Sequence, residues 1–344
     1  PARARTWTLL IQSQTCCQLH HGTINHSKFR VEIYLSNHIN AISEFDLKLI
    51  SDLIMFIKNI VILMMKSLFI ILILYDFSYS QHFTFLNTIG KFENASSFYI
   101  ASNGFIYVTD KSSNEVIQID TLGNELKDVG GFGWNISQFD EPIDVYADPL
   151  SVYISDKNNH RIQRFDRNLN FISQLYTREN KNSEERFGYP LGCVVSNQGD
   201  LYILDSENKR IVKFDLFGNF KLNFGGIDAG EFSLNNPKAL SIDSKGVIFV
   251  ADENYLIAFD QFGNGISKSR FDEKINSIEI IFDRMIITTE NHLYYINTAV
   301  ETPEVKKMIL DDFSEIRIVS ALLFNDKLLI LSPNEIFTFR LSSE

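Results

Sequence analysis

Three histidines in residues 81–344 are the first side chains to consider for metal chemistry. They are His82, His160 and His292. A zinc site is built from about three or four ligands at roughly 2.0–2.3 Å. His160 and His292 occupy the same position in two distant copies of a repeat, so we do not expect them to reach one ion. We interpret both as structural residues of turns.

Acidic residues offer oxygen ligands for calcium, which needs several of them to converge. Asp144, Glu207 and Glu253 are candidates. Aspartates also recur once in each of four copies of the repeat, as Asp110, Asp156, Asp205 and Asp252. A residue that recurs with a repeat usually supports a turn within each copy. We therefore expect no metal or other cofactor, with calcium as the alternative.

Nucleophilic catalysis has little support in the sequence. Cys193 lies in the pattern of a buried strand and is expected to be a small core residue. No serine lies in the context of a nucleophile elbow. Arg161 and Arg210 could bind an anion, but their equivalent positions favour surface or inter-blade contacts. We predict no catalytic residue, and the balance favours a protein that is not an enzyme.

The elements that position these side chains form a repeat. Apolar runs end in a polar residue at positions 110, 156, 205, 252, 290 and 332, where the residue is Asp four times, then Glu and Ser. The steps of 38 to 49 residues are close to the ~40–45 residues of a propeller blade. Each run has one strand pattern before it and two after it. The sequence predicts an all-β fold, a six-bladed β-propeller of four-stranded antiparallel blades.

The two ends of the domain are predicted to close the ring. The last copy, from about residue 319 to 341, contains three strand patterns. Residues 83–90 precede the first copy and resemble the fourth strand at 221–226. We predict that this N-terminal strand pairs with residues 335–341 and completes the last blade. Closure of the ring limits exposed strand edges, which otherwise favour aggregation.

The segment before the domain has the features of an export signal. Lys66 precedes an apolar run at 68–75, and Ser78 and Ser80 are small residues before a predicted cleavage site. A transmembrane helix over 60–75 is disfavoured, since a span needs about 20 apolar residues and Lys66 lies within this one.

We therefore divide the chain into three parts. Residues 64–80 are a predicted signal peptide, and 81–344 are the propeller. Residues 1–63 are expected to lie outside the fold, either upstream of the true start codon or as a poorly ordered extension. The mature protein is expected to be secreted or periplasmic, without stable insertion in a membrane.

Several strings of the repeat resemble NHL repeats. They are Asp-Lys-Asn-Asn-His-Arg-Ile at 156–162, and the segments 224–232 and 246–252. The resemblance extends over about 100–260 and weakens in the last two copies. It implies a six-bladed propeller of the exported bacterial type. Similar propellers include a zinc-dependent amidating lyase and calcium-dependent lactonase-like hydrolases, and some NHL propellers bind RNA. Leu169 stands where other turns carry Gly, which predicts an altered turn there.

The charge of the chain argues against nucleic acid as a partner. The formal net charge is −11, and residues 81–344 hold 25 Lys and Arg against 38 Asp and Glu. Such a balance gives no basic surface for a polyanion. We expect a monomeric, non-catalytic exported propeller that binds a protein, peptide or glycan, or acts as a scaffold. The alternative is a metal-dependent (calcium or zinc) hydrolase, lactonase or lyase with its site on the central channel axis.

One face of the disc is the predicted binding surface. Loops that lead into the inner strands gather there, together with the turns between second and third strands. A mixed polar surface suits a protein, peptide or glycan better than a buried apolar ligand. The predicted binding residues are Asp144, Asn158, Asn159, Glu207, Lys209, Lys238, Glu253 and Asn254.

Overall fold

The computed structural model describes residues 49, 51–66, 83–310 and 317–341. The described residues belong to two units, with the boundary between Tyr79 and Ser80. Residues 51–66 of the first unit are an α-helix, which the sequence did not lead us to predict. Most of the predicted signal peptide, and His82, lie outside the described residues. In the part of the chain that the structure describes, no helix is both long and apolar enough to cross a membrane.

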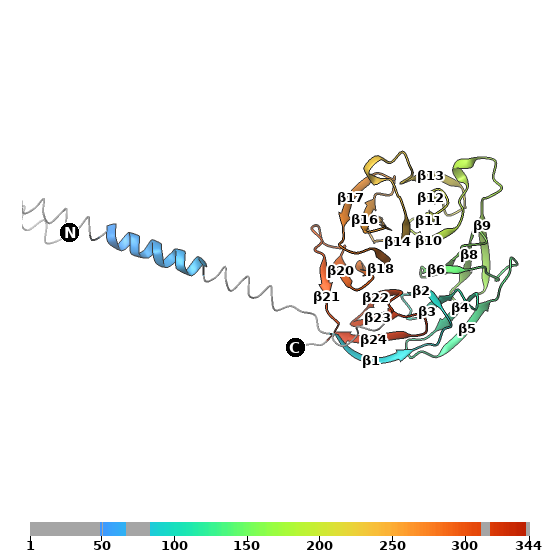
Figure 1. The fold of residues 1–344 in the computed structure, drawn as a ribbon, viewed down its shortest axis with the longest axis horizontal. Coiled ribbons are helices and arrows are strands. Elements are labelled where there is room, and N and C mark those ends of the chain that lie inside the picture. The colour runs from blue at the N-terminus through green and yellow to red at the C-terminus, as the bar shows by residue number, and fades with distance from the viewer. Residues whose placement is uncertain (1–48, 50, 67–82, 311–316, 342–344) are drawn as a thin grey trace, which may run out of the picture. The chain divides into compact units, whose positions relative to one another are not determined.

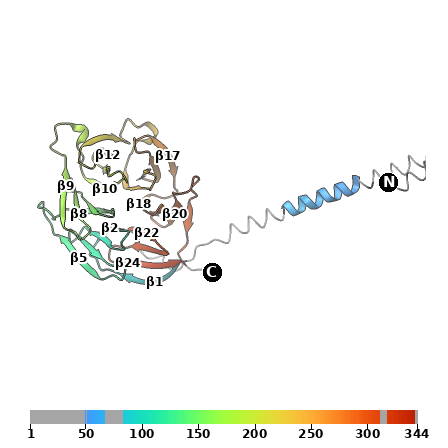
Figure 2. The ribbon, with the colours of Figure 1, turned by 180° about the vertical axis from the view of Figure 1, so that it is seen from behind.

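The second unit is a ring of six four-stranded antiparallel sheets, which confirms the predicted six-bladed β-propeller (Figures 1 and 2). Blade 1 contains β2 (Ala95–Ile100), β3 (Ile106–Asp110), β4 (Glu115–Ile119) and β5 (Glu125–Gly130). Blade 2 contains β6 (Pro142–Ala147), β7 (Ser151–Asp156), β8 (Arg161–Asp166) and β9 (Phe171–Tyr176). Blade 3 contains β10 (Pro190–Val195), β11 (Leu201–Asp205), β12 (Arg210–Phe214) and β13 (Phe220–Phe224).

Blades 4 to 6 continue the same meander. Blade 4 contains β14 (Pro237–Ile242), β15 (Ile248–Asp252), β16 (Tyr255–Phe259) and β17 (Gly265–Arg270). Blade 5 contains β18 (Ile275–Ile281), β19 (Arg284–Thr289), β20 (Leu293–Asn297) and β21 (Lys306–Met308). Blade 6 contains β22 (Ser320–Phe324), β23 (Lys327–Leu331), β24 (Ile336–Leu341) and β1 (Phe83–Ile89). Two short 3₁₀ helices, η1 (Ser183–Glu185) and η2 (Gly230–Phe232), lie in the loops before β10 and β14.

Apolar side chains between neighbouring blades form the core. The second strands β3 and β7 are buried at every position, because each blade is covered by a neighbour on both faces. This burial explains why their sequences read as continuous apolar runs rather than as alternating ones. The outer strands β5 and β17 carry mostly exposed or half-buried residues. Blades 1 and 6 share one cluster, in which Phe98 and Val108 pack with Leu329.

A buried aspartate ends the second strand in each of the first four blades: Asp110, Asp156, Asp205 and Asp252. In blade 4, the Asp252 carboxylate accepts hydrogen bonds from the backbone N–H groups of Asn235 and Asn236 at 2.6–3.0 Å. These amides lie in the loop just before the inner strand β14, and equivalent bonds occur in blades 1 to 3. An unpaired buried amide costs about 1–3 kcal/mol. The aspartate therefore fixes where the inner strand of its blade begins.

Blade 5 also links its second strand to the incoming loop, but here the carboxylate belongs to the loop. The sequence led us to place Glu290 at the repeat position, but that was wrong, because Thr289 pairs with Ile275 at the strand end. Glu273, from the loop before β18, accepts hydrogen bonds from the Thr289 hydroxyl at 2.6 Å and from the Asn291 amide at 3.1 Å. The link between second strand and incoming loop is thus kept with the partners exchanged.

The predicted closure of the ring is confirmed. Strand β1 pairs antiparallel with β24, from Phe83 opposite Leu341 to Ile89 opposite Ile336. The next segment is held as well, since the Phe92 amide donates to the Asn334 carbonyl at 2.8 Å. Inner strands β2 and β22 also contact each other, so the ring is continuous on both its inner and outer sides.

Loss of the closing strand tests this architecture. A chain lacking residues 83–90 should unfold at a temperature lower by at least about 10 °C, since β24 then loses its outer partner and the blade 6 core is uncovered. Differential scanning calorimetry measures the change. A chain that lacks residues 1–66 is the control and should keep its melting temperature. Equal melting of the chain without 83–90 would contradict the proposed role of β1.

Removal of one buried aspartate tests the link between hairpin and loop. Asp252→Ala should lower the free energy of unfolding by about 3 kcal/mol, because it leaves the amides of Asn235 and Asn236 without their charged acceptor. Asp260→Ala in the same blade is the control, since this aspartate supports an exposed turn and should cost less than about 1 kcal/mol. Urea denaturation compares the two variants. Equal losses in the free energy of unfolding would show that the buried aspartate contributes no more to stability than the exposed one.

Candidate functional site

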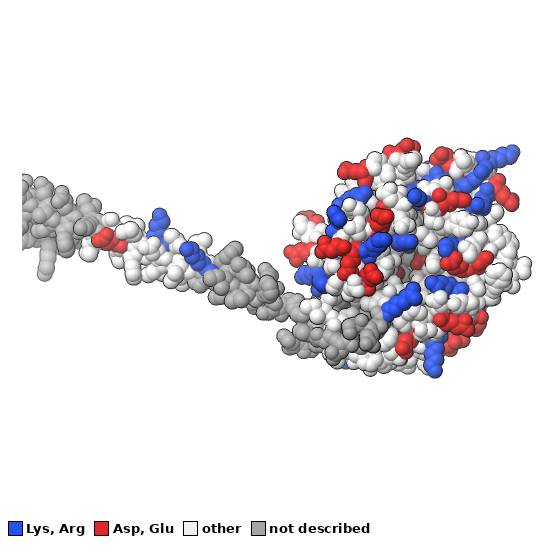
Figure 3. Space-filling model, viewed as in Figure 1, with Lys and Arg blue, Asp and Glu red and all other residues white. Residues whose placement is uncertain are grey.

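The meander gives the disc two faces with different connections. We call the loop face the side that carries the loops into the inner strands and the turns between second and third strands. We call the turn face the opposite side, which carries the turns between first and second strands and between third and fourth strands. Lys, Arg, Asp and Glu side chains are interspersed over the face of the propeller shown in Figure 3. Neither sign of charge forms a continuous patch in that view.

Seven of the eight predicted binding residues are spread over three blades of the loop face. Asn158 and Asn159 lie in the turn of blade 2, and the latter is buried and donates to Asp156 and to the Gly133 carbonyl. Asn254 donates to the Phe271 carbonyl at 3.0 Å. These asparagines serve the fold locally. Four further members are exposed, namely Glu207, Lys209, Lys238 and Glu253.

Within this group, Glu207 has a charged partner. Its carboxylate pairs with Arg178 at 2.7 Å, while Lys209 and Glu253 have positive φ angles of 53° and 56° in their turns. The structure therefore does not bring the predicted residues together in one pocket. The polar loop face that they define remains a prediction.

Asp144, the eighth predicted residue, lies on the inner strand β6 beside the central channel. Its carboxylate accepts hydrogen bonds from the Ser97 hydroxyl at 2.8 Å and from the Cys193 amide. A side chain on Gly192 would come within 3.0 Å of this carboxylate, so glycine there leaves room for it. Burial raises the pKa of Asp144 to about 6.

A second acid, Glu279, lies on the inner strand β18 of blade 5. Burial, and then the charge of Asp144, raise its pKa well above the usual value. Tyr99 and Tyr146 line the channel from β2 and β6 with ring centroids 5.0 Å apart. Burial also raises the pKa of Tyr99, and the charges of Tyr146, Glu279 and Asp144 add to this effect. The channel thus places two carboxyl groups among tyrosines, in surroundings that favour their neutral forms.

The residues considered for metal chemistry do not converge. Among the described residues, no group of three or more His, Cys, Asp or Glu side chains could hold a metal ion. His160 packs edge-on against Tyr189 with ring centroids 4.2 Å apart, and its Nδ1 accepts from the Tyr189 amide. His292 lies across the ring in blade 5, with its Nδ1 2.7 Å from the Glu273 carboxylate. Cys193 is buried, and burial raises the pKa of its thiol.

The two arginines considered for anion binding hold loops instead. Arg161 is 1% exposed and pairs with Asp156 at 2.7 Å, and its guanidinium also donates to the carbonyls of Trp134 and Gln138. Arg210 similarly pairs with Asp205 and donates to carbonyls of the loop around η1. Each arginine therefore fastens the loop that leads into its own blade.

The turns between third and fourth strands share one construction on the turn face. In blade 3, Asp215 accepts from the amides of Phe217 and Asn219 at 3.0 and 2.9 Å. Gly218 follows with a positive φ of 82°. The altered turn predicted at Leu169 is not observed, since Leu169 takes a φ of 55° and Asp166 makes the same bonds. Leu169 is buried in the core, which offsets the cost of about 1–2 kcal/mol for this backbone conformation.

Large apolar side chains stand exposed at the tips of these turns. Leu122, Phe217 and Phe262 occupy the same turn position in blades 1, 3 and 4 and are 77%, 81% and 68% exposed. The aspartate, glycine and asparagine of each turn make its hydrogen bonds, so the apolar side chain is not needed for the turn itself. Leu150 and Phe282, in turns between first and second strands, are also exposed on this face.

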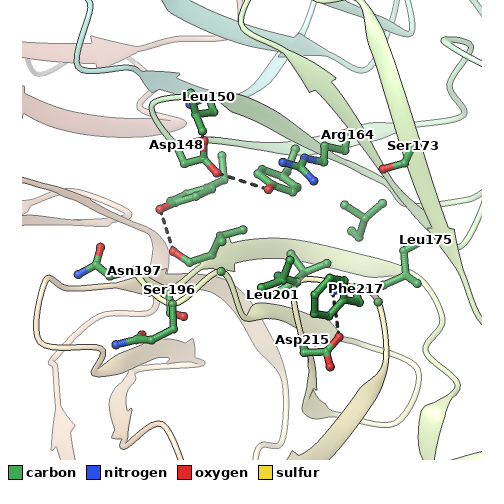
Figure 4. A pocket seen from close by; sticks show the side chains of 18 of the residues that line it. Asp148, Leu150, Arg164, Ser173, Leu175, Ser196, Asn197, Leu201, Asp215 and Phe217 are labelled. Carbon is green, nitrogen blue, oxygen red and sulfur yellow. Dashed lines mark hydrogen bonds between the residues drawn. The ribbon is translucent and has the colours of Figure 1, made fainter.

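A cavity of about 790 Å³ opens between blades 2 and 3 on the turn face (Figure 4). One wall carries Asp148, Leu150 and Arg164 from blade 2, and the opposite wall carries Asn197 and Phe217 from blade 3. None of the eight predicted binding residues lines it. The predicted residues concern the loop face, although the apolar residues between the Asp and Asn of these turns were a signal in the sequence for the turn face.

Comparison with known proteins agrees with the fold. Residues 187–214 match the NHL repeat family model. The chain is 32% identical over 143 residues to Protein brain tumor of Drosophila melanogaster and 30% identical over 143 residues to B-box type zinc finger protein ncl-1 of Caenorhabditis elegans. Each match covers 40% of this chain but only 13% and 16% of the respective relative. With the six-bladed ring, the repeat match supports an NHL-repeat β-propeller.

Solved structures with the same fold include two lyases. A catalytically inactive virginiamycin B lyase of Staphylococcus aureus with quinupristin has a TM-score of 0.52 at 15% identity, covering 72% of this chain and 80% of that one. A streptogramin B lyase has a TM-score of 0.52 at 11% identity, covering 76% and 97%. At these identities the likeness concerns the fold alone. The matches do not support the exported bacterial subtype expected from the sequence.

The raised pKa of Glu279 makes a prediction about stability and pH. Between the unfolded pKa of glutamate, about 4.3, and the raised pKa of Glu279, the folded state binds more protons, so stability falls as pH rises. Glu279→Gln removes this loss. Its melting temperature relative to the parent protein should rise from pH 4 to pH 8, by about 2–4 °C for each kcal/mol.

Melting curves across this pH range provide the measurement. Glu125→Gln is the control for the loss of one negative charge, because Glu125 is exposed on the outer strand β5. Its melting temperature should follow that of the parent protein at every pH. A constant difference between Glu279→Gln and the parent protein would contradict a carboxyl group that is neutral in the folded channel.

Proposed function

We propose that the protein is a non-catalytic propeller that docks a protein partner on its turn face. The observation that carries the proposal is the repeated exposure of Leu122, Phe217 and Phe262 at equivalent turn tips. Water-exposed apolar groups are unfavourable, and groups gathered on one face are typical of contact surfaces between proteins. The cavity between blades 2 and 3 opens on the same face and gives a partner a concave feature to fill.

The loop face also carries exposed apolar residues, but they are organised differently. Phe132, Trp134 and Ile136 come from the loop before β6, and Ile227 from the loop before β14. Trp134 has a role in the fold, since the Arg161 guanidinium lies 5.1 Å from its ring centroid. Phe132 and Ile227 occupy one position of the repeat, directly after the Gly-Gly pair at the end of the fourth strands of blades 1 and 3. The turn tips expose an apolar residue in three blades and lie on the face where the cavity opens, so the turn face is the better candidate.

The animal relatives support a recognition role in a general way. The matched stretch is a small part of Protein brain tumor and of ncl-1. This pattern suits a propeller that serves as a contact module within different proteins. A protein partner is favoured over a glycan because the exposed turn residues are apolar, whereas hydroxyl-rich ligands need convergent polar groups.

The alternative, a metal-dependent hydrolase, lactonase or lyase on the channel axis, has one observation in its favour. Asp144 and Glu279 have perturbed pKa values, as active-site carboxyl groups often do. A carboxyl group must lose its proton to bind a cation, however, and burial opposes that loss here. Metal analysis of the purified protein with a lactonase and esterase screen tests this alternative.

Export remains part of the proposal. Support comes from the sequence of residues 64–80, where a lysine, an apolar run and two small residues follow in order. Cleavage after Ser80 would release a secreted or periplasmic propeller that begins at Gln81. N-terminal sequencing of the natural protein checks this, and a mature chain that retains Lys66 would contradict it.

Substitution of the turn tips tests the docking surface. The triple variant Leu122→Ser, Phe217→Ser and Phe262→Ser should recover at least about tenfold less of any protein captured by the parent chain, a loss of about 1.4 kcal/mol or more. Affinity capture from the source cells with quantitative mass spectrometry makes the comparison. Ile227→Ser, at a 92% exposed residue of the loop face, is the control and should capture normally. Equal capture by the triple variant would overturn the assignment.

A further inference from the structure

The cavity between blades 2 and 3 contains three charged side chains that line it: Asp148, Arg164 and Asp215. Both carboxylates are already satisfied by the protein. Asp148 accepts from the amides of Leu150 and Ser151 at 2.7 Å each. Asp215 holds its own turn and pairs with Lys221 at 2.9 Å. Neither carboxylate therefore calls for a ligand.

Arg164 differs from these two groups. Its Nε donates to the Ser151 hydroxyl at 3.0 Å, and its guanidinium lies 5.5 Å from the ring centroid of Tyr153. Within residues 83–310 and 317–341, no carboxylate forms an ion pair with it. In Figure 4 the guanidinium lies at the cavity near Ser173. The side chain is thus held in place while its terminal nitrogens remain open to the cavity.

Blade 3 also carries a cation at this position, whereas blades 1 and 4 have Gln118 and Ala258 there. Leu201 pairs with Phe214 as Val152 pairs with Phe165, so Lys213 is equivalent to Arg164. Lys213 lies 5.1 Å from the ring centroid of Tyr202, the counterpart of Tyr153.

The difference between the two blades is the carboxylate. Lys213 pairs with Asp200 at 2.8 Å, and the residue equivalent to Asp200 in blade 2 is Ser151. Blade 2 therefore has the cation and its aromatic support, as blade 3 does, but has a short hydroxyl where blade 3 has the carboxylate.

Because no carboxylate of the described residues pairs with Arg164, we infer that the cavity binds a peptide segment whose Asp or Glu side chain pairs with this guanidinium. Guanidinium and carboxylate match in a planar, bidentate geometry. The exposed side chains of Leu150 and Phe217 come from opposite walls, so apolar residues on either side of the acid find contacts. This arrangement favours an internal acidic residue over a chain terminus. The inference rests on the proposed function, since it names the chemistry of a partner on the turn face.

The charge of the chain limits the sequence of such a peptide. Residues 81–344 carry 38 acidic and 25 basic side chains, so a strongly acidic segment would be repelled at long range. A single acid between large apolar residues is therefore the expected motif. Arg164 supplies the attraction locally, where the cavity walls exclude part of the water and strengthen the ion pair.

The test uses the full chain and a synthetic library of octapeptides with acetylated N-termini and amidated C-termini. Bound peptides should be enriched in Asp or Glu next to Leu, Ile, Phe or Met. Selected peptides are resynthesised and their affinities measured by fluorescence anisotropy. Arg164→Gln should weaken binding at least tenfold, and replacing the peptide acid by its amide should have no further effect on that variant.

Two further variants keep the result interpretable. Ser151→Asp supplies the carboxylate that blade 3 has and should abolish peptide binding by occupying Arg164. Arg284→Gln, at a cation outside the cavity, should bind peptide normally. Thermal melting identifies a variant that fails to fold, in which case the other cavity variant decides.

Three outcomes would overturn the inference: no peptide is retained, selected peptides bind Arg164→Gln as tightly as the parent chain, or peptides with a free C-terminal carboxylate and no internal acid bind more tightly. If Arg164→Gln still captures the protein partner while the triple turn variant does not, the docking surface stands and the acidic motif falls. If peptide binding depends on Arg164 while the triple variant captures the protein partner normally, the acidic motif stands and the docking surface falls.

Discussion

The carboxylate that ties the second strand to the incoming loop in blades 1 to 5 is the constraint on which most of the propeller depends. It accepts backbone amides that arrive from the previous blade, so it sets the point at which each inner strand starts. In blade 5, Glu273 supplies the carboxylate where Thr289 stands in place of the aspartate, and in blade 6 the position is held by Ser332. Once the inner strands are placed, the outer strands and both sets of turns follow from the meander.

The repeat made the fold predictable, since six apolar runs and one unmatched strand leave a single way to close the ring. Local exchanges were less predictable. Thr289 could not be told from Glu290, because an apolar run does not show which of its last residues pairs with Ile275. Leu169 retains the glycine-type turn because its burial compensates for the backbone cost. The cavity depends on which side chains of two different blades face each other, and the pattern of one blade does not contain that information.

The channel illustrates how the ring changes the chemistry of ordinary residues. Asp144 and Glu279 belong to different blades, and neither has a neighbouring residue in the sequence that explains its raised pKa. Their proximity arises only when the inner strands converge. Small neighbours such as Ser97 and Gly192 leave space for the Asp144 carboxylate. Asp144 was predicted on the loop face, and the structure places it in the wall of the channel.

In a repeat protein, residues shared by all copies hold the scaffold, so differences between copies are where recognition can arise. Lys213 and Asp200 neutralise each other and leave nothing for a partner. Arg164 has the same support from a tyrosine but Ser151 in place of the acid, so its orientation is fixed in advance and little entropy is lost when a carboxylate binds. The histidines and aspartates that first suggested chemistry belong to the shared scaffold. Ser151 does not suggest a binding site by its residue type, yet it leaves the Arg164 guanidinium without a carboxylate and so available to a ligand.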